Sequence, residues 1–437
     1  MYRLILFASI SLSSLVLPAQ TWLLDTLSAM PEPVTNQAVC EGFIDDTAFV
    51  YSFGGLDSTK QHGGIHLKSW RYNTVTDHWE PLPDMPDSLG KIAAAASRVG
   101  DTIYVIGGYH VFPDGSEKSS NLVHRFDIRT NTWLSNGANI PVQIDDHVQS
   151  VWRDSLIYVV TGWSDVGNVP AVQIYDPAHD NWLEGTPTPF NSFYAVFGSQ
   201  GYIFDDTIYY FGGAAYAQNF PIQGRMRRGI IEPDSPTVIR WGSRKLQNGL
   251  VGYRMAATRV FDDLHWLGGA SVTYNYNPVA YNGSGPVSPS ELNLYYDPEK
   301  RIHGTSVTPG LPMDLRGIAE ASDTIKYIVG GIGPNQVVSD QTLRLRYQNL
   351  IGNSVEEELQ SRVRVIWDGQ SDTLMLSSES VPVSNLSVLV TDIQGREVAI
   401  RTSSPTGSVN MFGIPRGIYI LTFESGGNAF LIKVQKY

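Results

Sequence analysis

The chain has 437 residues, 43 Asp and Glu against 31 Lys and Arg, a formal net charge of −12 and a single Cys. An acidic chain without a basic block is a poor match for nucleic acid, because binding to phosphates requires clustered Lys and Arg. One Cys supplies neither an intramolecular disulfide nor a thiolate cage for a metal. A hydrophobic content of 42%, with abundant Gly, Tyr and Trp, favours strands and turns around a core, so we expect an all-β protein.

The first 19 residues have the pattern of a secretory signal peptide. Arg3 supplies one positive charge, an apolar stretch interrupted by Ser runs from Leu4 to Leu17, and Ala19 is a small residue suited to cleavage. The stretch is too short to span a bilayer, which argues against a membrane anchor. We therefore predict cleavage after Ala19, no membrane span in the mature chain, and a location outside the cell or on its surface.

Six apolar runs that end in glycine recur along residues 49–331. The last glycine of each run lies 51 to 62 residues after the previous one, and an Asp precedes it by six to nine residues. Asp suits a tight turn between two strands, because its side chain can hydrogen-bond to the local backbone. The last glycines are Gly55, Gly108, Gly162, Gly213, Gly269 and Gly331, and the Asp residues are Asp46, Asp101, Asp154, Asp206, Asp263 and Asp323.

Downstream of the glycines, an aromatic residue is followed by Trp seven positions later. The clear pairs are Tyr72 and Trp79, Phe126 and Trp133, and Tyr175 and Trp182. The sequence between the members of a pair is rich in turn residues, which predicts a hairpin joining a third strand to a fourth. Four strands in a repeat of about 55 residues are typical of a β-propeller blade.

These features resemble the kelch family over residues 22–347. Three units depart from its signature: Thr161 replaces a glycine in the third, the fourth lacks a clear aromatic–Trp pair, and the fifth has His303 in place of Trp. The resemblance implies a six-bladed kelch β-propeller over residues 20–347. Because the sixth unit ends after its third strand, we predict that an N-terminal strand beginning at Trp22 completes it and closes the ring.

A separate C-terminal region follows. Residues 348–362 are polar and indicate a linker, and the short apolar runs in residues 363–437 predict a small β-sandwich. The Asp392/Gly395 turn, the Gly417/Tyr419 strand and a basic last strand resemble the type A C-terminal sorting domain of type IX secretion cargo, although that family's opening segment is missing. The resemblance implies a sorting label that engages the secretion machinery. A generic immunoglobulin-like accessory domain is the alternative.

The longest insertions are b–c loops, the loops between the second and third strands of a unit, which a propeller brings to one face. They are expected at residues 109–121, 163–170, 214–237 and 271–291. Their aromatic residues suit recognition of sugars and peptides, because a ring presents an apolar face and loses little entropy on ordering. The alternative is that these rings pack the loops against one another. The predicted ligand-binding residues are Lys91, Tyr109, His110, Trp163, Tyr216, Tyr274, Tyr276 and Tyr281.

The predicted loop at residues 214–237 also carries a group of positive charges. Arg225, Arg227 and Arg228 lie close together in an otherwise acidic chain, which predicts a local anion-binding patch unless these side chains are simply solvated.

Two classes of function fit this pattern, with a structural or adhesive surface role as a third possibility. No metalloprotease, nucleophile-elbow, P-loop or dinucleotide-binding motif is present, so the first hypothesis is a module that binds a glycan or a protein or peptide without metal or cofactor. The alternative is an enzyme, because the chain also resembles the exported sialic acid mutarotases of bacteria. That resemblance implies an acid/base residue and an Arg at the rim. The candidates for these roles are Asp146, His147, Arg254, Arg316 and Glu320.

Overall fold

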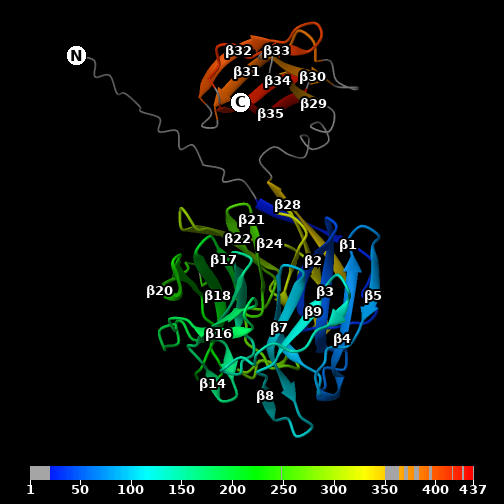
Figure 1. The fold of residues 1–437 in the computed structure, drawn as a ribbon, viewed down its shortest axis with the longest axis vertical. Helices are drawn as coiled ribbons and strands as arrows, with labels where there is room; N and C mark the ends of the chain where they lie inside the picture. The colour runs from blue at the N-terminus through cyan, green and yellow to red at the C-terminus, as the bar shows by residue number, and fades with distance from the viewer. Residues whose placement is uncertain are drawn as a thin grey trace, which may run out of the picture. The chain divides into compact units, whose positions relative to one another are not determined.

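The computed structural model describes residues 20–247, 249–349, 364–368, 373–377, 383–392, 396–415, 417–425 and 428–436. The predicted signal peptide and most of the predicted linker lie outside these ranges. The described residues form strands and turns with two short 3-10 helices, η1 (His62–Gly64) and η2 (Pro334–Gln336), and no α-helix. None of their helical segments has the length and apolar character needed to cross a membrane. They divide into two compact units, Thr21–Tyr347 and a C-terminal unit within Gln348–Tyr437 (Figure 1).

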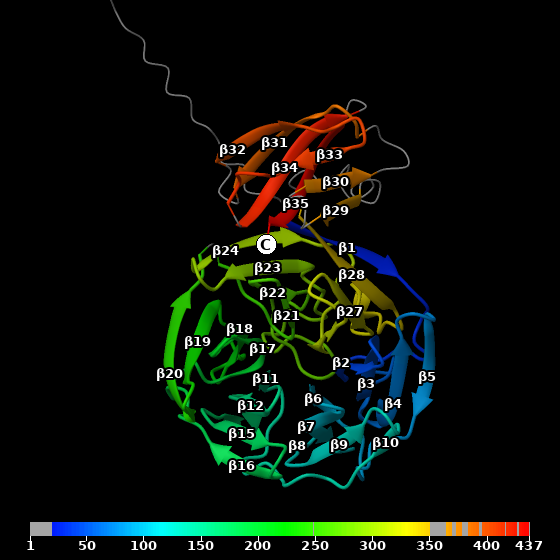
Figure 2. The same ribbon diagram turned by 45° about the horizontal axis from the view of Figure 1, so that its top comes forward.

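The first unit contains six sheets of four or five strands, and Figure 2 shows them following one another around a ring with the first strands toward the centre. The first sheet contains β2 (Ala38–Ile44), β3 (Thr47–Leu56), β4 (Ile65–Asn73) and β5 (His78–Leu82), with β25 (Arg316–Gly317) beside β2. The second contains β6 (Ile92–Val99), β7 (Thr102–Val111), β9 (Val123–Asp127) and β10 (Thr132–Trp133), with β8 (Glu117–Ser119) beside β7. The third contains β11 (Val148–Trp152), β12 (Leu156–Val160), β15 (Val172–Asp176) and β16 (Asn181–Glu184).

The remaining three sheets repeat this order. The fourth contains β17 (Val196–Phe204), β18 (Thr207–Ala215), β19 (Arg225–Glu232) and β20 (Ser235–Lys245). The fifth contains β21 (Ala256–Val260), β22 (Asp263–Leu267), β23 (Leu292–Asp297) and β24 (Ile302–Val307), and the sixth contains β26 (Ala319–Glu320), β27 (Ile325–Val329), β28 (Thr342–Asn349) and β1 (Gln20–Thr26). A separate hairpin, β13 (Trp163–Ser164) and β14 (Gly167–Asn168), follows β12. The predicted loop at residues 214–237 is therefore wrong in extent, because β19 occupies its second half.

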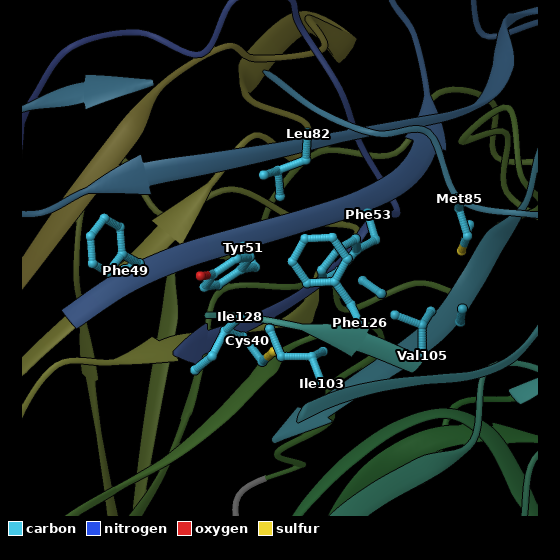
Figure 3. Close-up of a cluster of buried hydrophobic side chains, with 12 residues drawn as sticks. Cys40, Phe49, Tyr51, Phe53, Leu82, Met85, Ile103, Val105, Phe126 and Ile128 are labelled. Carbon is cyan, nitrogen blue, oxygen red and sulfur yellow. The ribbon is translucent and has the colours of Figure 1, made fainter. Parts of the chain in front are cut away.

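Apolar side chains pack between neighbouring sheets. Between the first and second sheets, Tyr51 and Phe53 of β3 meet Phe126 of β9, with ring centroids 5.9 and 5.6 Å apart (Figure 3). Cys40 lies in the same cluster, and burial raises the pKa of its thiol well above the ordinary value. The thiol therefore stays protonated and acts as a small apolar group.

A Trp on the outer strand anchors each of four consecutive sheets. Its indole N–H donates to a backbone carbonyl in the segment that connects the preceding sheet to its own sheet. These bonds run from Trp79 to Ser28, Trp133 to Pro83, Trp182 to Ala138 and Trp241 to Thr186, at 2.8 to 3.2 Å. Trp241 is thus the anchor of the fourth unit, which the sequence pattern did not identify.

The N-terminal strand completes the last sheet. β1 lies beside β28, as the sequence predicts, and Asp25 of β1 forms ion pairs with Arg344 and Arg346 of β28 at 2.9 and 2.8 Å. The pairing covers strand edges that would otherwise be open at the two ends of this unit.

The C-terminal unit contains two antiparallel sheets. One consists of β29 (Arg364–Asp368), β30 (Thr373–Ser377) and β33 (Ser408–Asn410), and the other of β32 (Glu397–Thr402), β31 (Ser387–Asp392), β34 (Gly417–Ser425) and β35 (Asn428–Lys436). Both contribute to one apolar cluster, in which Leu374 and Val409 of the first sheet join Val388 and Leu421 of the second.

Candidate functional site

Each sheet has a residue in the left-handed backbone conformation near the point where the chain enters its first strand. These residues are Asn36, Ala93, Asp146, Gly198, Arg254 and Asp314, with φ between 47° and 65°. Each of the middle four donates its backbone N–H to the carbonyl of the member before it, at 2.8 to 3.3 Å, and Asn36 donates to Asp314 at 3.3 Å. The carbonyl of Arg254 accepts from Leu315 at 3.0 Å, which completes the circuit. We call this set the backbone ring. It lies where the chain enters the first strands of the sheets.

Three side chains of the backbone ring form a buried charge cluster. Arg254 Nη2 donates to Asp146 Oδ2 at 2.5 Å and Nη1 to Asp314 Oδ1 at 2.9 Å. Burial lowers the pKa of Arg254, but its acidic neighbours, above all Asp146, raise it well above the ordinary value. Burial raises the pKa of Asp314, and Arg254 opposes that rise. Arg254 is fully engaged by protein carboxylates, so it is not available to hold the carboxylate of a ligand.

Arg316 and His147 lie next to this cluster. Arg316 Nη2 donates to the carbonyl of His147 at 2.8 Å, and Nη1 lies 3.6 Å from Asp146 Oδ1. Burial, and then the charge of Arg316, lower the pKa of His147 to about 3. The imidazole is therefore neutral near pH 7, and it lacks the second ring proton that an imidazolium ion would donate as a general acid.

A polar cavity of about 330 Å³ lies on the side of the backbone ring away from the b–c loops. Residues of all six sheets line it. The polar ones include Glu41, Arg98, Gln149, Gln200, Tyr202, Arg316 and Glu320. Two of the five predicted catalytic residues, Arg316 and Glu320, thus line this cavity, whereas Asp146, His147 and Arg254 do not.

Glu41 and Glu320 place two carboxyl groups on the cavity wall. Glu320 accepts hydrogen bonds from the hydroxyls of Tyr202, at 3.2 Å, and Thr258, and lies 3.4 Å from the ammonium of Lys326. Burial, and then the nearby charge of Glu320, raise the pKa of Glu41. A carboxyl with a raised pKa beside a second carboxyl that contacts an ammonium group is an arrangement suited to acid/base chemistry. The sequence pattern did not single out Glu41.

On the opposite face, most of the predicted ligand-binding rings pack against one another. Trp163 contacts Phe220 at a centroid distance of 5.6 Å, and Phe220 contacts Tyr281 at 4.7 Å. Tyr274 is fully buried and donates a hydrogen bond to Asp314 at 3.2 Å. Tyr109 is also buried, in a cluster against which Tyr276 packs. These residues therefore follow the alternative interpretation, in which the rings hold the loops together.

Lys91 and His110 are likewise engaged within the protein. Lys91 Nζ lies 2.7 Å from Asp87 Oδ2, and both side chains are almost fully buried. Burial lowers the pKa of Lys91, and the charge of Asp87 opposes this effect. His110 Nδ1 lies 2.8 Å from the carbonyl of Gly90. Neither residue presents a free charged group on an open surface.

Tyr216 differs, because it belongs to a group of exposed apolar side chains. Val166, Phe190, Phe193 and Tyr216 have exposed fractions of 83%, 77%, 49% and 63%. Their three segments are joined by Asn168, whose amide donates to the carbonyls of Ala195 and Ala214 at 3.0 Å. We call these four residues the exposed loop patch. The sequence analysis identified only Tyr216, because the other three fall in short turns without a repeating pattern.

Comparison with known proteins identifies one repeat motif. Residues 93–135 match the kelch motif. The match falls on the second sheet of a ring of sheets whose fold is all-β and propeller-like, so the chain contains a kelch motif within a fold of that class.

Individual relatives are distant. The chain is 25% identical over 249 residues to Kelch-like protein terF of Aspergillus terreus, covering 55% of this chain and 49% of the relative. It is 24% identical over 174 residues to Kelch-like protein 36 of Bos taurus, covering 39% and 26%. The chain thus spans half or less of the length of these curated relatives. The solved structure of YjhT is similar with a TM-score of 0.58 and 16% identity, covering 74% of this chain and 99% of that one. That likeness concerns the fold alone.

Proposed function

We propose that this chain is an exported six-bladed kelch β-propeller that binds a protein or peptide partner through the exposed loop patch. The observation that supports this proposal is the contrast between buried rings elsewhere on the loops and four exposed apolar side chains on segments that Asn168 links. Exposed apolar groups gathered on an otherwise polar surface mark interaction sites. Aromatic residues are enriched at protein interfaces. A glycan stacked on Tyr216 is the other ligand class that this surface suits.

The test is selection of binding peptides from a random displayed library against the mature chain, residues 20–437. Binding should weaken at least tenfold when Phe190 and Tyr216 both become Ser. Phe261→Ser is the matched control, because Phe261 is also an exposed ring but lies in the turn between β21 and β22. Equal binding by the double variant and the native chain would reject the patch. A glycan array on the same variants tests the sugar alternative.

We also propose that residues 1–19 direct export and that residues 363–437 form a β-sandwich that acts as a type IX sorting label. The Gly417/Tyr419 strand and the strand order of the C-terminal unit support this part of the proposal. A chain truncated after Tyr347 should be absent from the cell surface in a host with that secretion system. Normal surface delivery of the truncated chain would rule out the sorting role.

An exported sugar mutarotase is the second candidate function, and the polar cavity favours it. Glu320 and Glu41 supply carboxyl groups and Arg316 a positive charge along one wall. Exchange between sialic acid anomers, followed by NMR, should be accelerated by the native chain and slowed at least tenfold in Glu320→Gln. The absence of acceleration by the folded native chain would remove this candidate.

A further inference from the structure

A basic pocket lies on the outer strands of the fourth and fifth sheets and shares no residue with the exposed loop patch or the polar cavity. The hairpin of β19 and β20 carries six of the chain's 31 Lys and Arg and only two acidic residues, in a protein of net charge −12. Its basic residues are Arg225, Arg227, Arg228, Arg240, Arg244 and Lys245. Such a local excess creates a positive surface on an acidic molecule.

The structure divides these basic residues between different environments. Arg227 is buried and its guanidinium donates to the carbonyl of Gly212 at 2.6 Å, so its charge is held by the protein backbone. The guanidinium of Arg225 lies 4.3 Å from the ring centroid of Phe193. Arg228 and Arg244 line a pocket of about 240 Å³ together with Arg301 of the β23–β24 turn, and Arg227 forms part of the pocket wall. Of the three arginines in the predicted anion-binding patch, Arg227 and Arg228 line this pocket and Arg225 does not. Arg244 and Arg301 were not part of the prediction.

Local geometry holds these guanidinium groups in place. Arg244 Nη1 donates to the carbonyl of Arg301 at 2.7 Å, and Nη2 lies 3.2 Å from His303 Nδ1. Burial, and then Arg244, lower the pKa of His303, so this imidazole is neutral and accepts the bond. Arg228 lies opposite Gly242, where an added Cβ would stand 3.5 Å from Arg228 Nε. The glycine therefore leaves room for the side chain of Arg228 over the sheet.

The arginines of the pocket differ from neighbouring basic residues in their partners. Among the residues that the structure describes, no carboxylate forms an ion pair with Arg228, Arg244 or Arg301. Neighbouring basic residues do form such pairs: Arg240 with Glu232 at 3.1 Å and Lys300 with Asp297 at 2.6 Å. Tyr296 also lines the pocket, and burial raises the pKa of its phenol while the three arginines oppose that rise.

We propose that Arg228, Arg244 and Arg301 bind a tetrahedral oxyanion, phosphate or sulfate, either as the free ion or as a group carried on a sugar. The planar fork of a guanidinium matches two oxygens of such an ion, and charge-assisted hydrogen bonds are about twice as strong as neutral ones. The Ser243 hydroxyl, which also lines the pocket, supplies a neutral donor.

The experiment is isothermal titration of the mature chain, residues 20–437, at pH 7 and low ionic strength. The ligands are inorganic phosphate, inorganic sulfate, glucose 6-phosphate and glucose. Saturable binding of an oxyanion without binding of glucose is expected. Tighter binding of glucose 6-phosphate than of phosphate would identify a sugar-borne group, and the reverse order a free ion.

Variants make the assignment specific. Arg244→Gln and Arg301→Gln should each weaken binding about tenfold, since each removes a charge-assisted contact. Arg240→Gln is the matched control, with the same charge change in the same hairpin, and should bind within about twofold of the native chain, since Arg240 is already paired with Glu232. Circular dichroism checks the fold of each variant, and Arg228→Gln gives an independent third test. Failure of every oxyanion to bind, or an equal loss in Arg240→Gln, would overturn the proposal.

Discussion

Arg254 and Asp146, 108 residues apart in the chain, are joined by hydrogen bonds from both Nε and Nη2 of the guanidinium, and each is only 2% exposed. Arg254 precedes the fifth sheet and Asp146 the third, so the pair spans two sheets that are not neighbours in sequence. Asp314, which precedes the sixth sheet, completes the cluster. Three sheets are thereby joined through one guanidinium at the centre of the unit.

Removing this guanidinium should destabilise the first unit strongly. Arg254→Met leaves two carboxylates buried without their partner, a change that typically costs about 3–5 kcal/mol in the free energy of unfolding. Urea unfolding followed by Trp fluorescence measures it, since nine of the ten Trp lie in the first unit. Arg259→Met is the control, because Arg259 forms an exposed pair with Asp323 and should cost less than about 1 kcal/mol. Equal effects of the two substitutions would contradict the assigned role.

Acid should destabilise the protein below about pH 6.5, the ordinary pKa of histidine. Burial, followed by Arg316, lowers the pKa of His147 to about 3, and burial lowers that of His265 to about 4. Between those values and 6.5 the unfolded chain binds more protons than the folded one. The free energy of unfolding should therefore fall as the pH falls, by about 1.4 kcal/mol per pH unit for each histidine.

The substitution His265→Gln tests this assignment, because it removes one titrating group and keeps a polar side chain beside Asn293. Urea unfolding at pH 6 and pH 5 should show a smaller pH dependence in this variant. An unchanged slope would show that His265 does not titrate as described.

A methyl group on Gly198 should disrupt the backbone ring. Gly198 has φ +65°, and an added Cβ would stand 2.1 Å from the ring of Tyr253. Gly198→Ala should therefore cost more stability than Gly100→Ala, whose φ is +55° but whose Cβ would meet nothing within 4 Å. The control measures the cost of the left-handed backbone conformation alone, about 1–2 kcal/mol. The difference between the two variants in thermal unfolding then gives the additional loss of stability caused by the clash with Tyr253. Equal melting temperatures would refute the steric argument.

Trp241→Ala should destabilise the fourth sheet as much as Trp182→Ala destabilises the third. Both indoles donate to a carbonyl of the preceding connection, at 3.0 and 2.8 Å. A loss of about 3–5 kcal/mol is expected for truncating a packed Trp, measured by urea unfolding. A nearly neutral Trp241→Ala would show that the two positions are not equivalent.

The repeated features were predictable because they are local. Each glycine, each turn Asp and most Trp anchors recur at short, fixed spacing, so one chain displays them several times. Trp241 escaped this search because its ring partner is Tyr210 of the second strand, at a centroid distance of 6.2 Å, rather than a residue seven positions earlier. The β19–β20 hairpin is longer than the corresponding hairpins of the other units, so the seven-residue spacing between an aromatic residue and Trp is absent there.

The candidate sites were less predictable, because burial depends on contacts between distant segments. The composition of its loop suggested that Tyr274 would face solvent, yet its hydroxyl bonds to Asp314, 40 residues later. Glu41 and Glu320 approach only because the ring brings the first and sixth sheets together, with the amide of Glu320 donating to Glu41 at 3.2 Å. Residue spacing within one repeat cannot predict a contact between two different repeats.

The pairing of β1 with β28 also sets the order of events during synthesis. Asp25 leaves the ribosome 319 residues before its partner Arg344, so the first strand to be translated is among the last to find its place. Contacts of such long sequence separation form slowly, and incomplete sheets expose edges that promote aggregation. Ring closure therefore follows translation of nearly the whole first unit. Until then, chaperones that act on the nascent chain bind a set of sheets whose ring is not yet closed.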